Sequence, residues 1–106
     1  MSGIPGLLGL GLRAGTVIIG VEAVRRALQS DEIRCLVVAA DASQRALEKT
    51  VRLAMARGVP HVAGPPAQEL GARLGKPPVM VVGVRDQALT DGILRLAAER
   101  QGATEE

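Results

Sequence analysis

Short apolar runs alternate along the chain with stretches in which apolar residues recur every three or four positions. Such an alternation predicts a domain built of β-strands and α-helices in turn. The four runs that predict strands are Val17–Ile19, Arg34–Ala39, Val59–Ala63 and Val79–Val84. The second and fourth runs are apolar on both faces, which suits the centre of a sheet that helices cover on both sides. Pro60 limits the third run to a sheet edge or the start of a strand.

The stretches of helical period lie between these runs. The predicted helices are Ile4–Ala14, Val21–Gln29, a segment from the cap Ser43 to Arg57 ended by Gly58, Ala67–Leu74, and a last helix capped by Asp86. The third helix is expected to face the core through Leu47, Val51, Ala54 and Met55. The first segment contains three glycines that each cost up to about 1 kcal/mol inside a helix, so only its leucines favour one. The tail Gly102–Glu106 is expected to fray.

This order of elements predicts an α/β fold, with a four-stranded mixed or parallel sheet sandwiched between two layers of helices. The 106 residues suffice for one domain. Hydrophobic residues make up 47% and charged residues 23%, which excludes a disordered chain. The chain has no Phe, Trp or Tyr, and this excludes RNA or DNA binding by base stacking on aromatic platforms. The net charge of +2 permits a nucleic-acid partner only if the cations cluster.

The candidate chemistry is sparse. One histidine, His61, and one cysteine, Cys35, supply neither a metal-binding cluster nor a catalytic triad. We therefore expect His61 in or beside an edge strand, Cys35 buried as a small hydrophobe, and no metal. The glycine patterns lack the strand–loop–helix context of a phosphate loop, so we expect no cofactor and no enzymatic activity. The apolar segment Ile4–Leu12 is too short for a membrane span and lacks the charged start of a signal peptide, which predicts a cytoplasmic protein without a membrane partner.

One end of the predicted sheet gathers features that suit phosphate. Gly20 and Asp41 each follow a strand and precede a helix, while the loop Gly75–Pro78 leads into the last strand. Helix N-termini offer free N–H groups and a positive dipole end to anions, and nearby arginines add charge. The alternative interpretation is a solvated surface, in which Glu22 and Arg26 form an ordinary pair one helical turn apart.

Eight short segments in matching order resemble a known family. They are Leu7-Leu8-Gly9-Leu10, Arg13-Ala14-Gly15, Gly20, Leu36–Ser43, Gly58-Val59-Pro60, Glu69-Leu70-Gly71, Gly75-Lys76 and Val84-Arg85-Asp86. Together they resemble the kink-turn RNA-binding ribosomal-protein family of L-seven-Ae type, and most closely its small bacterial YlxQ-like members. The resemblance implies a three-layer α-β-α sandwich with a mixed sheet, and a helix in the first segment.

The resemblance also implies an RNA site at the same end of the sheet. The residues expected to form it are Arg13, Gly20, Val21, Glu22, Arg25, Arg26, Asp41, Ala42, Ser43, Gly75, Lys76, Pro77 and Pro78. Glu22 and Ala23 stand where the family has Asn and Glu, which read base edges in the kink-turn. This difference predicts weakened kink-turn recognition.

The hypothesis is therefore non-enzymatic binding of structured RNA, ribosomal or ribosome-associated, with ribosomal or translation proteins as further partners. Two alternatives stay open at this point. A protein–protein adaptor with the same fold and no RNA affinity is favoured by the substituted residues and the low net charge. The substrate-binding part of an RNA-modifying enzyme is the other, because related sandwiches occur fused to methyltransferase domains.

Overall fold

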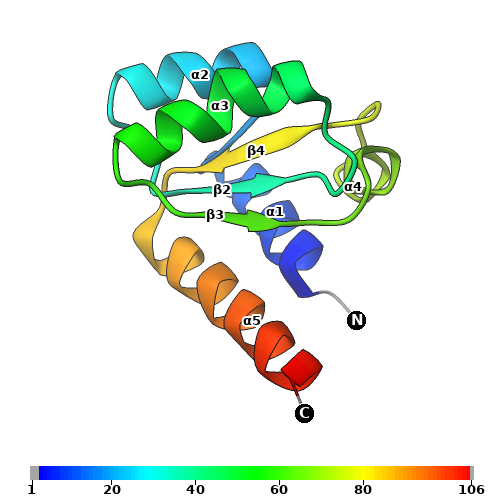
Figure 1. The fold of residues 1–106 in the computed structure, drawn as a ribbon. Coiled ribbons are helices and arrows are strands. Elements are labelled where there is room, and N and C mark those ends of the chain that lie inside the picture. Colours follow the sequence, from blue (N-terminus) through cyan, green and yellow to red (C-terminus); the bar gives the residue numbers. More distant parts are fainter. Residues whose placement is uncertain (1–2, 106) are drawn as a thin grey trace.

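The computed structural model describes residues 3–105, and the side chains of residues 3–99. Within this range the chain forms five helices and four strands that alternate (Figure 1). Their bounds are α1 Gly3–Ala14, β1 Val17–Ile19, α2 Val21–Gln29, β2 Cys35–Val38, α3 Gln44–Ala56, β3 His61–Ala63, α4 Ala67–Arg73, β4 Val81–Val84 and α5 Gln87–Glu105. The order of elements predicted from the sequence is confirmed, including a helix in the glycine-rich first segment. The fraying expected from Gly102 stays a prediction.

The four strands form one sheet in the order β1-β4-β2-β3. β4 runs antiparallel to both of its neighbours, β1 and β2, whereas β3 runs parallel to β2, so the sheet is mixed. β2 and β4 lie at the centre and are buried along their whole length, as their apolar sequences predicted. β3 lies at an edge, as Pro60 predicted.

Helices cover both faces of this sheet, which confirms the predicted three-layer sandwich. α2 and α3 lie on one face, α1 and α5 lie on the other, and α4 lies at one end of the sheet (Figure 1). The core is accordingly divided in two by the sheet. The side under α2 and α3 is filled by residues such as Val24, Leu28 and Leu36, and the opposite side by Leu8, Leu70 and Ile93.

Two polar caps mark the starts of α3 and α5, and a glycine allows α1 to pack closely against α5. Ser43 Oγ accepts a hydrogen bond from Ala46 N at 3.1 Å, and Asp86 Oδ2 accepts one from Leu89 N at 2.7 Å, as predicted for two caps. In α1, a Cβ on Gly11 would lie 2.5 Å from a methyl group of Leu89. The glycine that weakens α1 as a helix therefore lets it pack closely against α5.

Cys35 is fully buried, as predicted. Burial in the apolar core raises the pKa of its thiol, against a smaller opposite effect from the Thr90 side chain.

The inner face of α3 was predicted incorrectly at one residue. Met55 was expected to face the core, but 65% of it is exposed. The buried residues of α3 are Ala46, Thr50 and Ala54, one turn apart from each other. The Thr50 hydroxyl can be buried because it donates a hydrogen bond to Ala46 O at 2.7 Å. With these three residues facing the sheet, Met55 lies on the outer side of α3.

Candidate nucleic-acid interface

Three loops predicted to converge do meet at one end of the sheet. Because β4 is antiparallel to β1 and β2, its start lies beside the ends of those two strands. Hydrogen bonds join the loops there: Gly20 N donates to Val81 O at 3.1 Å, and Ala39 N donates to Met80 O at 2.8 Å. The three segments therefore form one continuous surface held by the sheet.

Gly20 leaves the N-terminus of α2 open. Its φ of +106° and ψ of 150° belong to a region that side-chain-bearing residues rarely adopt, and no side chain caps the helix. The first helical bond runs from Val24 N to Gly20 O at 2.9 Å. The N–H groups of the three preceding residues, Val21 to Ala23, therefore have no partner within α2 and remain available to an anion.

The other two helix starts at this end are closed by the protein itself. Besides its bond to Ala46, Ser43 donates its own N–H to Met80 Sδ at 3.3 Å. Asp41 Oδ1 accepts a hydrogen bond from Ala67 N at 2.7 Å, which caps α4. Asp41 and Ser43 thus hold loops in place, and of the two open helix starts that the sequence predicted at this end, only that of α2 is open in the structure.

The loop Gly75–Pro78 is exposed and packs closely on α4. Gly75 has a φ of +70°, and Lys76 N donates to Gly71 O at 2.8 Å. A Cβ on Gly71 would overlap the carbonyl of Pro77, so the loop approaches α4 more closely than any other residue there would permit. The residues from Gly75 to Pro78 are all exposed, whereas Val79 is buried. This exposed loop therefore leads into β4 at the end of the sheet where Gly20 lies.

An ion-pair network joins α2 to α3 beside this surface. Lys49 Nζ lies 2.5 Å from Glu22 Oε2, and Arg25 Nη1 donates to Lys49 O at 2.9 Å. Lys49 holds the pKa of the Glu22 carboxyl below its ordinary value, first by the hydrogen bond and then by its charge. The pairing of Glu22 with Arg26 considered from the sequence is thus replaced by a pair with Lys49.

Two arginines named from the sequence have different surroundings from Arg25. Arg26 is exposed on α2, and no ion pair reaches it within the part of the chain that the structure describes. Arg13 lies in the last turn of α1, which leads into the start of β1, and therefore at the opposite end of the sheet from Gly20. The structure brings Arg26 to the surface near Gly20 and separates Arg13 from it.

Sequence reasoning missed Lys49 and Met80. The sequence shows Lys49 as a cation within a predicted helix, but it does not predict the pair with Glu22, because the two residues lie far apart in the sequence. Met80 was counted as a strand residue, although its sulfur and its carbonyl oxygen bind the backbone of the loop after β2. Neither contact leaves a periodic signal in the sequence.

Two other kinds of site find no support among residues 3–99. No group of three or more His, Cys, Asp or Glu side chains there could hold a metal ion. No described helix is both long and apolar enough to cross a membrane.

Comparison with protein families gives a match over residues 4–91, to the model described as the ribosomal protein L7Ae/L30e/S12e/Gadd45 family. The chain belongs to this family. A comparison of the sequence with curated proteins gives no significant match.

Two solved structures share the fold. A Bacillus halodurans protein described as having unknown function is 26% identical, with a TM-score of 0.85 over 92% of this chain and 99% of that one. The Giardia lamblia 15.5kD RNA binding protein is 17% identical, with a TM-score of 0.72 over 93% of this chain and 85% of that one. At that identity the second likeness shows the fold alone.

Proposed function

We propose that this chain binds structured RNA, without catalysing a reaction, at the end of the sheet where Gly20 opens α2. The observation that carries the proposal is the uncapped N-terminus of α2 at the same end of the sheet as the exposed loop Gly75–Pro78. Membership of the L7Ae family and the fold shared with the Giardia RNA binding protein support it. The RNA is ribosomal or ribosome-associated in this proposal, with ribosomal or translation proteins as further partners in the cytoplasm.

The open N–H groups of α2 suit an RNA phosphate, because they lie at the N-terminus of the helix, which is the positive end of its dipole. Arg26 lies about 9 Å from Gly20 along the axis of α2, at a rise of 1.5 Å per residue. A phosphate next to the one bound at the helix start is therefore within reach of its side chain. It is exposed and without an ion-pair partner among the described residues, so binding it to RNA breaks no ion pair of the protein. Lys76 adds a second cation from the facing loop.

Selectivity for kink-turns is weakened in this proposal, as expected of a member that is YlxQ-like. The family's Asn gives and accepts hydrogen bonds at base edges, whereas an ionised Glu22 only accepts them and is already bound to Lys49. Ala23 offers no side-chain acceptor in place of the family's Glu. Each lost base-edge pair costs about 1–3 kcal/mol by analogy with DNA readout, so two losses lower affinity roughly a hundredfold or more.

The test of the site is a filter-binding titration against ribosomal RNA at several salt concentrations. Arg26→Ala is expected to weaken binding to all sequences alike and to lower the salt slope by about one unit. Arg13→Ala is the matched control, since it removes the same charge at the opposite end of the sheet and should leave both quantities unchanged. If Arg13→Ala weakened binding as much as Arg26→Ala, the RNA site would not lie at the end of the sheet proposed here. Absence of salt-sensitive binding at micromolar protein would favour the adaptor instead.

The test of selectivity is a titration of a kink-turn RNA with the natural protein and with the double variant Glu22→Asn, Ala23→Glu. We expect weak binding by the natural protein and a large gain in the double variant, because both base-edge groups are restored. The single variant Glu22→Gln is the control for loss of the Lys49 ion pair. Nanomolar binding by the natural protein, or no gain in the double variant, would contradict weakened selectivity while leaving RNA binding in place.

A further inference from the structure

The outer face of α2 and α3 carries a greater net positive charge than the complete chain. The two helices lie side by side on one face of the sheet, and both begin at the end where Gly20 lies (Figure 1). Five of their charged side chains are cations and two are carboxylates, which gives a net charge of +3: Glu22, Arg25, Arg26, Arg45, Glu48, Lys49 and Arg52. The complete chain has a net charge of +2, so the rest of the molecule is slightly acidic. The cations are therefore clustered on this face.

The carboxylate of Glu22 lies among three of these cations. It forms the ion pair with Lys49, and beyond the larger effect of Lys49 the charges of Arg25 and Arg45 also lower the pKa of this carboxyl. Arg25 joins the two helices, because its guanidinium donates a hydrogen bond to Lys49 O. One negative charge is thus shared among three positive charges. The cluster keeps an excess of positive charge beside the open start of α2.

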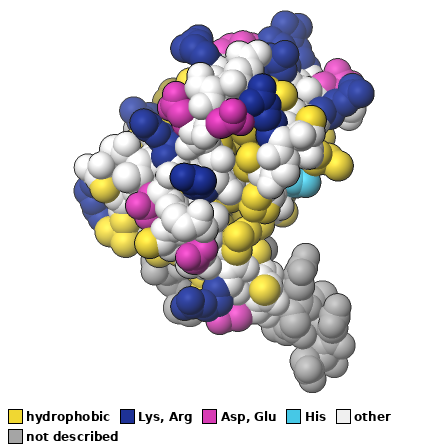
Figure 2. Space-filling model, turned by 90° about the vertical axis from the view of Figure 1, so that its left-hand side faces the viewer, with side chains coloured by type: hydrophobic (Ala, Val, Ile, Leu, Met, Phe, Trp, Pro, Cys, Tyr) yellow, Lys and Arg dark blue, Asp and Glu magenta, His cyan; other side chains and the backbone are white. Residues whose placement is uncertain are grey.

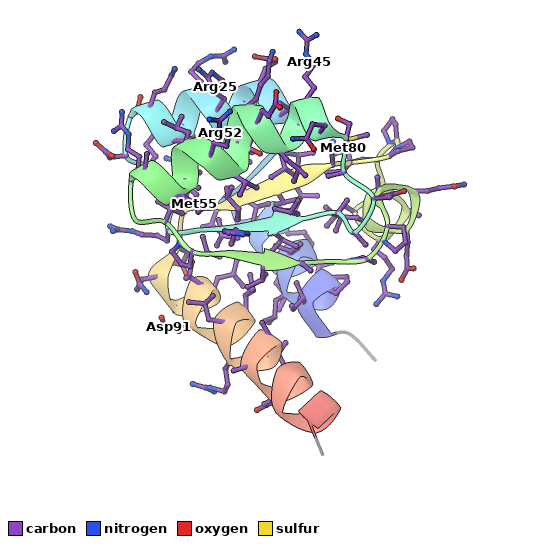
Figure 3. All side chains as sticks on the ribbon, in the orientation of Figure 1. Arg25, Arg45, Arg52, Met55, Met80 and Asp91 are labelled. Carbon is purple, nitrogen blue, oxygen red and sulfur yellow. The ribbon has the colours of Figure 1, made fainter. Side chains whose placement is uncertain are left out.

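Arg45 and Arg52 extend the positive surface along α3. They are seven positions apart, almost two helical turns, so they lie on the same side of α3 and about 10 Å apart along its axis. Both are exposed, both are labelled in Figure 3, and no ion pair reaches either from the described residues. Glu48, one turn before Arg52, offsets part of its charge and accepts a hydrogen bond from Gln44 Nε2. Figure 2 shows Lys and Arg side chains projecting at the top of the molecule, the side that α2 and α3 form in Figure 1.

The composition of this face favours a nucleic-acid duplex over a protein or a single strand. Protein interfaces have an apolar centre in which charged residues are depleted. On the described α2 and α3, the one large hydrophobic side chain that is exposed is Met55, at the end of α3 away from Gly20. The chain has no aromatic residue on which unpaired bases could stack. An RNA duplex needs neither feature, because proteins recognise its A-form shape through phosphates and 2′-hydroxyl groups.

We propose that the outer face of α2 and α3 binds a double-stranded stem of the same RNA that the open start of α2 holds. Arg45 and Arg52 contact phosphates of the stem, and Arg25 with Lys49 adds to the positive potential between them. These side chains meet the backbone and not the base edges, so the stem is bound without sequence preference. This proposal rests on the proposed function, since the face continues from the surface around Gly20.

The first measurement repeats the filter-binding titration against ribosomal RNA with the double variant Arg45→Gln, Arg52→Gln. We expect the salt slope to fall by about two units, because two phosphate contacts are lost. Arg13→Gln, Arg95→Gln is the matched control. It removes the same charge from two exposed arginines of α1 and α5, which cover the opposite face of the sheet, and should leave the slope unchanged. Glutamine is close to arginine in helix propensity, so both variants should stay folded.

The second measurement tests whether the bound segment is double-stranded. An RNA duplex of about 16 base pairs and one of its two strands alone each compete with ribosomal RNA for the natural protein. We expect the duplex to compete at a concentration at least about tenfold lower than the single strand, because its phosphates are denser and fixed in place. The double variant should lose this difference. Equal competition by the single strand would overturn the proposal.

The outcomes separate the stem contact from the proposed function. Binding of ribosomal RNA that is weakened by Arg26→Ala but has the same salt slope in the double variant would overturn the stem contact alone. Absence of salt-sensitive binding by the natural protein would overturn both. Unchanged binding of ribosomal RNA by the double variant, together with polyglutamate binding that this variant loses, would assign the face to an acidic protein and would overturn the stem contact.

Discussion

Replacing Gly71 by alanine should destabilise the protein and displace the loop at the candidate RNA interface. A Cβ on this residue of α4 would lie 2.7 Å from Pro77 C and 2.9 Å from Lys76 O, and closer still to Pro77 O. Reaching the 3.4 Å of an ordinary contact requires a shift of about 0.7 Å for Pro77 C and of more for Pro77 O, in backbone atoms rather than in a flexible side chain. Overpacking of this kind costs about 1–3 kcal/mol. The gain in helix propensity from glycine to alanine, up to about 1 kcal/mol, offsets only part of it.

Urea unfolding of Gly71→Ala should therefore show a net loss of about 1–2 kcal/mol, and each kcal/mol lowers the melting temperature of a domain this size by about 4–8 °C. Gly9→Ala is the matched control, because it is also a glycine inside a helix but a Cβ there meets nothing within 4 Å. That variant should gain stability from its higher helix propensity. If both variants shift stability in the same direction and by the same amount, steric exclusion by the Pro77 carbonyl is not what fixes the loop.

Two further predictions concern caps and charge. Ser43→Ala removes the hydroxyl that accepts a hydrogen bond from Ala46 N, and it should lower the free energy of unfolding by about 1 kcal/mol in thermal or urea unfolding. A loss below about 0.3 kcal/mol would contradict a stabilising role of this cap. The pKa of Glu22 is lowered in the folded state from an ordinary value of 4.5, so the stability from its pair with Lys49 is present above that value and is lost as the pH falls through the folded pKa. The difference in melting temperature between wild type and Glu22→Gln should thus be larger at neutral pH than at about pH 3, and a constant difference would contradict this.

The elements were predictable from the sequence because their signals are local. Ser43, Asp86 and Gly58 mark helix ends through the next few residues, and each does so in the structure. Strand ends were less accurate, because they depend on partners elsewhere in the chain. Val79 was assigned to a strand, for example, but it donates its N–H to Ala67 O, and β4 begins at Val81.

The candidate site was predictable in position but not in its contacts. The family resemblance and the order of the strands placed Gly20 and the loop Gly75–Pro78 at one end of the sheet, where the structure has them. The pairing of Lys49 with Glu22 and the capping of α4 by Asp41 are tertiary contacts between helices and loops far apart in the sequence. Arg13 was grouped with the site because it is a cation within a segment that matches the family, yet the intervening strand β1 carries the chain to the other end of the sheet.

The place of β4 within the sheet constrains how the chain folds. β4 is the last of the four described strands in the sequence, yet it lies between β1 and β2, and β1 pairs with no other strand of the described sheet. Val17 therefore pairs with Val84, across most of the length of the chain. Closing so long a loop is entropically costly before the ladder forms, and contacts between distant residues slow folding. As the ribosome synthesises the protein, Gly20 N can bond Val81 O only after β4 has emerged, so the surface proposed to bind RNA cannot be completed before then.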